Sequence, residues 1–379
     1  MKTNLLFLLI FSFFICSVHS QIIDKKLTES NFNSDTIKNR LERLNAKTPI
    51  ELYFTPSVEK TIKRYLNTRL EFYKKNIDKI NYYLPLFEEQ LQNQKIPAEI
   101  KYLPIIESRL DPSAVSKVGA TGLWQFMFYT ALENGLTMNS YVDERMDPLK
   151  STAAAALYLN KLHKIHNDWN LVLASYNAGP RTISRAKKKS GGYTNYWNIR
   201  PFLPSETANY IPSFIATMYI LEYANEHGIN IQKNDKPILN TEKIKIKEKT
   251  AFEHISDFFD YSTDSITHFN PSYIHGIVPG KNENELRLPA RLVDSFVMQE
   301  EEFYAFVKSE FDKREKPLPD LYSIDSKLVY KVKYGEFLGK IARKFGVKVS
   351  DIKRWNNLKN DKIRENQKLI IFPKRIPKS

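Results

Sequence analysis

The chain has 379 residues, of which 42% are apolar and 26% are charged, and it carries a formal net charge of +14. At roughly 150 residues per domain, this length indicates two to three folded units, and the apolar fraction excludes a wholly disordered or fibrous chain. The positive charge indicates an acidic partner. Composition alone leaves this partner as nucleic acid, an anionic membrane face or an acidic polymer.

The first twenty residues predict a secretory signal peptide. Lys2 precedes an apolar run over residues 5–15, which is shorter than the roughly 20 residues that a membrane-spanning helix needs. We expect cleavage after Ser20, which removes residues 1–20 and exports the chain to the periplasm or cell envelope. Lipidation of Cys16 is the disfavoured alternative, because isoleucine stands where a lipoprotein has a small residue.

Export changes what the positive charge implies. Cys16 is the only cysteine in the chain, so we expect no disulfide bond. An extracytoplasmic location argues against nucleic acid and favours an acidic polymer of the cell envelope as the partner. Peripheral association with the membrane and the oligomeric state both stay open.

The pattern after the signal peptide is mainly helical. We expect an N-terminal helical extension over residues 21–84, because its apolar residues recur at helical spacing. These are Ile62, Leu66, Leu70, Tyr73 and Ile77. Residues 85–228 predict one helical domain, in which Ser151 is the expected N-cap of a helix that continues through Ala153 to Ala156.

The last third of the chain contains an internal repeat. Residues 252–270 and 338–356 carry apolar residues at the same positions, 86 residues apart, and each copy then leads into a short apolar strand that ends in proline. The repeat predicts two small βααβ modules, at 240–290 and 328–374. Residues 291–327, charged and proline-containing, are expected to form a linker with some helical character. The predicted fold class is therefore mainly α, or α+β.

Glu107 is the strongest candidate for chemistry. It follows an apolar run that includes Leu103, Ile105 and Ile106. A carboxyl group held against apolar side chains can stay protonated near neutral pH and act as a general acid. Downstream, Gly119 and Gly122 allow a close approach of the backbone. Trp124 and Phe126 are interpreted either as an apolar face for a sugar ring or as core residues.

This segment resembles the catalytic signature of the goose-lysozyme-like (SLT) lytic transglycosylases. The motifs are Glu107-Ser108, then residues 112–116, then residues 119–127. Further blocks of that family recur in order at 142–148, 174–180 and 203–212. The two repeats resemble LysM modules, which bind glycans that contain N-acetylglucosamine. The combination is similar to the membrane-bound lytic murein transglycosylase D type.

The resemblance implies a lysozyme-like catalytic domain that acts on the glycan strands of peptidoglycan without a cofactor or a metal. It implies that Glu107 is the sole catalytic acid. It also implies substrate-binding roles for seven further residues, which are Ser116, Gln125, Met127, Tyr176, Asn177, Glu206 and Tyr210.

The chain departs from the family pattern at a few positions. Phe128 stands where proline is usual, and Ala208 stands where a basic residue is common. The first module lacks the usual Tyr-x-Val entry and Gly-Asp turn, so its glycan binding is left open. The second module keeps residues 330–332 and the turn at Gly335-Glu336.

The mechanism depends on whether a second carboxylate assists Glu107. A glycoside hydrolase normally uses two carboxylates, and the nearby candidates are Asp111, Asp143, Glu144 and Asp147. The resemblance implies instead that Glu107 acts alone, first as acid and then as base, and leaves a 1,6-anhydromuramic end. The alternatives are a hydrolytic muramidase and a non-catalytic peptidoglycan-binding scaffold.

Three weaker signals complete the pattern. His163 and His166 share a helix face, but no third ligand lies at a suitable spacing, so we interpret them as a surface or core pair rather than a metal site. The run at 187–189 is interpreted as a solvated loop, with contact to stem-peptide carboxylates as the alternative. Aromatic residues at 193–197 are interpreted either as sugar platforms or as core.

Overall fold

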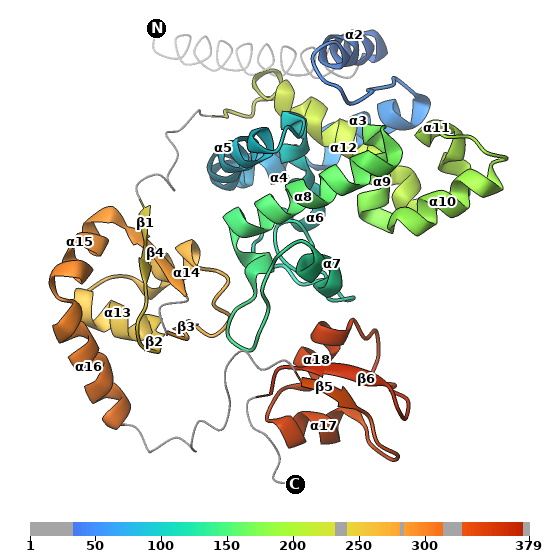
Figure 1. Cartoon of the computed structure of the whole chain (residues 1–379). Coiled ribbons are helices and arrows are strands. Elements are labelled where there is room, and N and C mark those ends of the chain that lie inside the picture. Colours follow the sequence, from blue (N-terminus) through green and yellow to red (C-terminus); the bar gives the residue numbers. More distant parts are fainter. Residues whose placement is uncertain (1–32, 232–240, 281–283, 314–327, 374–379) are drawn as a thin grey trace, which may run out of the picture. The chain divides into compact units, whose positions relative to one another are not determined.

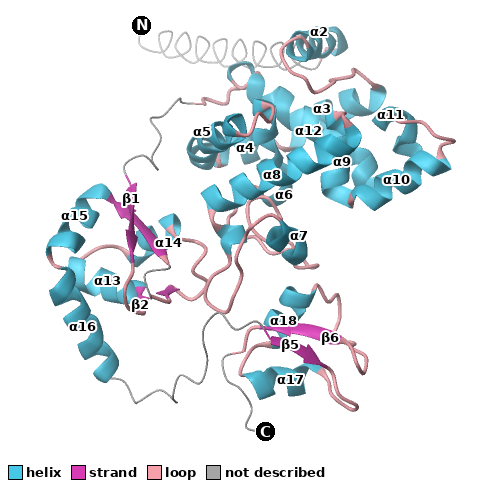
Figure 2. Ribbon diagram, viewed as in Figure 1, coloured by secondary structure: helices cyan, strands magenta, loops and turns pink. Residues whose placement is uncertain are grey.

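The computed structural model describes residues 33–231, 241–280, 284–313 and 328–373. The chain divides into two compact units, one formed by Met1–Asn81 with Leu162–Gln232 and the other by Tyr82–Lys161 with Lys233–Ser379. Figures 1 and 2 show helices in both units, whereas the described strands all belong to the second. The predicted signal peptide lies outside the described residues. Within the described ranges no helix is long and apolar enough to cross a membrane.

The first unit is entirely helical over its described residues. Its elements are α2 (Ser34–Asn45), α3 (Pro56–Thr68), α4 (Leu70–Lys75), α9 (Trp169–Ala178), α10 (Pro180–Lys189), α11 (Tyr196–Ile199), η3 (Arg200–Phe202), α12 (Ser205–Glu222) and η4 (Asn225–His227). Two longer helices, α5 (Ile77–Asn93) and α8 (Pro148–His166), begin in one unit and end in the other. The predicted helical character of the N-terminal extension is confirmed from residue 34 onward, and residues 21–32 lie outside the described residues.

Helix α12 forms the centre of the first unit because it is apolar on almost every face. Between Tyr210 and Leu221 every residue except Ser213 is buried, and the helix packs against α3 and α9. Some polar groups in this core are hydrogen-bonded, whereas the buried Ser175 Oγ on α9 has no hydrogen-bond partner among the described residues. The Tyr73 hydroxyl lies 3.3 Å from Thr217 Oγ1, and burial raises the pKa of Tyr73 to about 12.

The second unit begins with a helical part that contains the segment around Glu107. Its elements are most of α5, then η1 (Ala98–Tyr102), α6 (Leu103–Ser108), α7 (Phe128–Glu133), η2 (Glu144–Met146) and most of α8. The prediction of Ser151 as an N-cap is wrong, because α8 begins three residues earlier, at Pro148. The side chain of Asp147 accepts the backbone N–H groups of Leu149 and Lys150 and fills the capping role.

The two predicted βααβ modules are confirmed. Module 1 comprises β1 (Thr241–Lys245), β2 (Thr250–Ala251), α13 (Phe252–Phe259), α14 (Thr263–Phe269), β3 (Ile277–Val278) and β4 (Glu285–Pro289). Module 2 comprises β5 (Leu328–Lys331), α17 (Leu338–Phe345), α18 (Val349–Asn356) and β6 (Lys368–Ile371). In each, the outer strands pair antiparallel, with Thr241 opposite Pro289 and Leu328 opposite Ile371.

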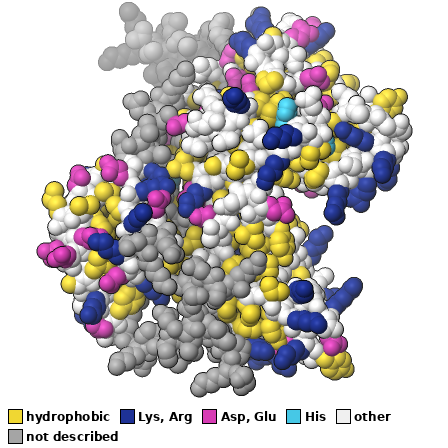
Figure 3. Space-filling model, in the orientation of Figure 1, with side chains coloured by type: hydrophobic (Ala, Val, Ile, Leu, Met, Phe, Trp, Pro, Cys, Tyr) yellow, Lys and Arg dark blue, Asp and Glu magenta, His cyan; other side chains and the backbone are white. Residues whose placement is uncertain are grey.

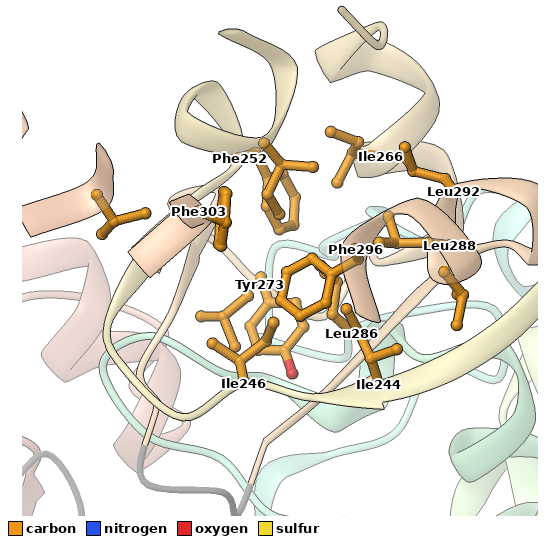
Figure 4. Packing of buried hydrophobic residues seen from close by; sticks show 14 of the residues in the cluster. Ile244, Ile246, Phe252, Ile266, Tyr273, Leu286, Leu288, Leu292, Phe296 and Phe303 are labelled. Carbon is orange, nitrogen blue, oxygen red and sulfur yellow. The ribbon is translucent and has the colours of Figure 1, made fainter. Parts of the chain in front are cut away.

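Module 1 is larger than the repeat predicts. Residues expected to form a linker form two further helices, α15 (Ala290–Met298) and α16 (Glu300–Asp312). Their residues Phe296, Phe303 and Val307 are buried in the module core with Phe252 and Ile266. Figure 4 shows the side chains of Phe252, Phe296 and Phe303 gathered in one cluster. The predicted helical character of this segment is confirmed, but residues up to 312 pack into the module core instead of forming a linker, because α16 has an apolar side with Phe303 and Val307 buried. Residues 314–327 lie outside the described residues.

A backbone seam joins module 1 to the helical part of its own unit. We define the seam as Tyr141–Asp143 with Ser272–Ile274. The Asp143 N–H donates to the Ser272 carbonyl at 2.8 Å, and the Ile274 N–H donates to the Tyr141 carbonyl at 3.0 Å. Val142 pairs with Tyr273 in an isolated β-bridge and is buried in the core of module 1. The core of module 1 therefore includes a residue from a family block of the helical part.

Candidate active site

Glu107 lies in the last turn of α6, a helix of six residues. Its side chain is half-buried, and Leu103, Ile105 and Ser108 around it are buried. This is the environment that the preceding apolar run predicts. The helix ends abruptly, because Arg109 and Leu110 both adopt left-handed backbone conformations, with φ of 57° and 59°.

Such conformations are costly for residues other than glycine, and they cluster at functional sites. A third instance, Gln125 with φ 49°, lies in the loop that follows α6. Its side-chain amide donates to the carbonyl oxygens of Ala114 (3.2 Å) and Gly122 (2.9 Å). Gln125 therefore braces the loop as well as presenting a half-buried amide. The concentration of strained backbone around Glu107 supports a functional role for this loop.

Ser116 fastens the other end of the same loop. Its hydroxyl oxygen accepts the Ala120 N–H at 3.0 Å, and its own N–H donates to the Ala120 carbonyl at 2.8 Å. Met127 is half-buried at the N-cap of α7. Trp124 and Phe126, which the sequence left as sugar platform or core, are both buried. The indole N–H of Trp124 donates to Thr152 at 2.9 Å, so these two rings belong to the core.

A buried ion pair supports this loop from beneath, and sequence analysis missed it. Asp143 and Arg145 are 1% and 0% exposed, and their side chains meet at 2.7 Å. Arg145 also donates to the carbonyl oxygens of Gly119 and Phe126, each at 3.1 Å. A Cβ atom at Gly122 would lie 1.8 Å from the Arg145 carbonyl oxygen, so this position requires glycine. The block at 142–148 is therefore the support of the loop.

The candidate second carboxylates near Glu107 are all engaged in structural contacts. Asp143 holds Arg145, and Asp147 caps α8. Glu144 pairs with Lys150 at 2.5 Å and accepts the Thr137 N–H at 2.7 Å. Asp111 accepts the Ser113 N–H at 2.9 Å in a local turn. These contacts favour a mechanism in which Glu107 acts without a second carboxylate from this segment.

The remaining predicted site residues lie in the first unit, at the end of α9 and the start of α12. Asn177 accepts the Thr207 hydroxyl at 2.8 Å, and its amide lies 3.4 Å from Glu206 Oε1. Glu206 is exposed, Tyr176 is half-buried and Tyr210 is buried. The structure thus brings Asn177 and Glu206 together through Thr207, a residue that sequence analysis did not single out.

The aromatic run at 193–197 and the two histidines have different environments. Tyr196 is buried and donates to the Ala208 carbonyl at 2.9 Å, whereas Tyr193 is 60% exposed. Of the two interpretations, core therefore applies to Tyr196. The His163 ring stacks on Trp169 with 4.6 Å between the ring centroids. In the part of the chain that the structure describes, no cluster of three or more His, Cys, Asp or Glu side chains has the arrangement of a metal site.

Comparison with known protein families matches three regions of the chain to three different domains. Residues 85–198 match the transglycosylase SLT domain, residues 330–372 match the LysM domain, and residues 240–305 match the LysM-like domain of the lytic transglycosylase MltD. The chain is 29% identical over 298 residues to the membrane-bound lytic murein transglycosylase D of Escherichia coli K12. That match covers 74% of this chain and 61% of the relative, so the chain spans about three fifths of the relative's length.

Two solved structures are also similar to part of the chain. The 70 kDa soluble lytic transglycosylase of Escherichia coli is 20% identical, with a TM-score of 0.34, and the match covers 47% of this chain and 32% of that one. The lytic transglycosylase Slt of Pseudomonas aeruginosa, solved as an inactive mutant, is 18% identical, with the same TM-score of 0.34. That match covers 46% of this chain and 31% of that one.

Proposed function

We propose, from the premise that this chain is a homologue of the lytic murein transglycosylases with an SLT domain and LysM domains, that it cleaves the glycan strands of peptidoglycan. The bond attacked is the β-1,4 bond between N-acetylmuramic acid and N-acetylglucosamine. The product carries a 1,6-anhydromuramic end. The predicted signal peptide and the LysM modules suit an enzyme that is exported to the cell envelope and held on the wall.

Glu107 carries both proton transfers in this proposal. Its carboxyl group protonates the glycosidic oxygen as the bond from C1 to that oxygen breaks. The C6 hydroxyl of the same muramic acid residue then attacks C1, and the Glu107 carboxylate takes the proton of that hydroxyl. No water is consumed. The observation that supports the proposal is that Asp143, Glu144 and Asp147 are held in structural contacts, while Asp111 is exposed and holds a local turn.

The other residues bind and position the glycan. Gln125 and Ser116 hold the loop next to Glu107 in shape, and Met127 lies half-buried at its end. Tyr176, Asn177, Glu206 and Tyr210 supply the wall formed by α9 and α12. Asn177, held by Thr207 at 2.8 Å, offers a fixed amide for the hydroxyl and acetamido groups of a sugar.

Product mass tests the chemistry. Digested cell-wall sacculi analysed by mass spectrometry are expected to yield anhydro ends, which are lighter by one water than hydrolysed ends. Hydrolysed ends would establish a muramidase instead. Glu107→Gln preserves the shape of the side chain and is expected to abolish cleavage while sacculus binding remains. Retained cleavage would remove Glu107 from its role, and an unchanged biological effect of the inactive variant would favour a scaffold.

A further inference from the structure

A basic pocket lies in the first unit beside the proposed glycan-binding wall. It has a volume of about 470 Å³ and lies between α10 and the segment at 201–204. Thr182, Arg185 and Lys189 line it from α10, and Phe202 and Leu203 line the opposite side. Among the residues that the structure describes, no acidic side chain lines the pocket. None of the roles proposed so far uses these residues.

The charge of the pocket is unbalanced. Arg185 and Lys189 stand four residues apart, so they face the same side of α10 and repel one another. Neither forms an ion pair with any carboxylate in the described ranges of the chain, and the Arg185 guanidinium lies 3.4 Å from the Thr182 hydroxyl. Figure 3 shows Lys and Arg side chains gathered along the edge formed by α10. A bound anion would relieve this repulsion.

The apolar residues that line the pocket indicate which kind of anion fits it. The Phe202 side chain is 43% exposed, and Pro201, Leu203 and Pro204 extend the apolar side of the pocket. The planar guanidinium of Arg185 matches a carboxylate through two parallel hydrogen bonds. A carboxylate carried on an alkyl chain fits both sides of the pocket, because its charged end meets Arg185 and Lys189 while its methylene groups cover Phe202.

The position of the pocket indicates where such a ligand comes from. The lining segment ends at Pro204, and α12 begins with the next residue and places Glu206 and Thr207 against Asn177. Helix α10 begins three residues after Asn177. A glycan strand along this wall would therefore carry its side groups past the pocket.

We propose that this pocket binds a carboxylate of the stem peptide that peptidoglycan carries on its muramic acid residues. The proposal rests on the proposed function, because it assumes a glycan strand on the wall formed by α9 and α12. It assigns Arg185 and Lys189 to the peptide rather than to the sugar. The chain would accordingly discriminate between glycan strands that keep their peptides and strands that have lost them.

The test compares two double variants of the same helix. The pocket variant is Arg185→Ala with Lys189→Ala. The control variant is Arg181→Ala with Lys188→Ala, which removes the same charges from exposed positions outside the pocket. Each is made in the full chain with the Glu107→Gln background, so that binding is measured without cleavage. The probes are peptide-bearing glycan strands and the same strands after an amidase has removed the peptides.

The pocket variant is expected to bind peptide-bearing strands about tenfold more weakly than the control variant, and stripped strands within about twofold of it. Equal binding by the two variants, or an equal loss on both kinds of strand, overturns the proposal. Calorimetric melting of both variants separates a folding defect from a binding defect. The product masses obtained with the unmodified chain test the proposed cleavage independently, because the binding assay does not depend on cleavage.

Discussion

The two repeats of this chain share a framework but present different surfaces around it. In module 1 the segment between the second helix and the closing strand is buried in part, with Ser272 at 6% and Tyr273 at 7% exposure. In module 2 no residue of the corresponding segment, 357–367, is buried, and it carries Lys359, Lys362 and Arg364. The first segment forms the seam with the helical part, whereas the second has no buried residue and is mostly exposed to solvent.

The shared framework depends on one asparagine in each copy. The Asn270 side chain donates to the Arg287 carbonyl at 2.7 Å and accepts the Arg287 N–H at 2.7 Å. Asn356 does the same to Ile370, at 2.7 Å and 2.6 Å. Each asparagine thus ties the end of the second helix to the closing strand. The comparison indicates that these asparagine hydrogen bonds and the apolar helix faces define the fold of both modules. The segment between the second helix and the closing strand can therefore differ in sequence and surface.

The largest expected effect on stability comes from a substitution in the seam of module 1. Val142→Asp places a charge among apolar side chains of the module core and is expected to lower the free energy of unfolding by about 3 kcal/mol or more. Val329→Asp in module 2 is the matched control, because Val329 is 54% exposed and the expected change is below about 1 kcal/mol. Chemical denaturation measures both. Equal losses of stability in the two variants would contradict the distinction between the buried seam of module 1 and the exposed surface of module 2.

Removing the asparagine of either copy tests the common framework. Asn270→Ala and Asn356→Ala each leave a backbone N–H and a carbonyl of the closing strand without their partner. We expect each to destabilise its own module by about 2 kcal/mol. Hydrogen exchange of the amides in β4 and β6 reads the two modules separately. A loss in only one copy would show that the resemblance of the two ties is superficial.

Mild acid is expected to lower the stability of the helical first unit before it lowers the stability of module 2. Burial is the main cause that lowers the pKa of His166 and of His227 to about 4. The positive charge of Lys187 adds to the effect on His166, and that of Arg40 adds to the effect on His227. Unfolding lets both imidazoles bind protons near their ordinary value of 6.5, so the unfolded state takes up more protons as the pH falls from 6.5 to 4. The free energy of unfolding then decreases by at most about 1.4 kcal/mol per pH unit for each histidine.

Module 2 contains no histidine, and its acid sensitivity should begin lower. Burial raises the pKa of Glu336, but hydrogen bonds from the Lys333 N–H and the Tyr330 hydroxyl outweigh burial and leave it below 4.5. The stability from this carboxylate is present above pH 4.5 and is lost as the pH falls through the lowered pKa. Calorimetry from pH 7 down to about pH 3 checks the order of the two losses. His166→Phe with His227→Phe is expected to flatten the dependence in the first unit.

The smallest expected effect concerns charge on the free segment of module 2. Replacing Lys359, Lys362 and Arg364 with glutamine is expected to weaken sacculus binding about threefold at low salt, with less effect at high salt. The matched control removes three exposed cations of module 1, Lys245, Arg291 and Lys308. Equal weakening by both variants would indicate that total charge, rather than the open segment, retains the chain on the wall.

The sequence was most informative where local pattern and fold agree. Helices α13 and α17 begin 86 residues apart, as the repeat predicts, because each is defined by its own apolar face. The half-buried position of Glu107 also follows from the apolar run before it. The buried Arg145 could not be found this way, because its partners Gly119 and Phe126 lie far from it along the chain. An arginine in a polar block gives no local sign that it is fully buried.

The first unit has a consequence for how the chain folds. Its core contains contacts such as that between Tyr73 and Thr217, which are 144 residues apart, and the second unit begins and ends one of its parts within that interval. The entropic cost of loop closure grows only slowly with loop length, but contacts between residues so far apart in the chain slow folding. During synthesis α2 and α3 can complete their packing only after α12 has been made, because Arg40 of α2 contacts Tyr219, which lies 179 residues later in the chain.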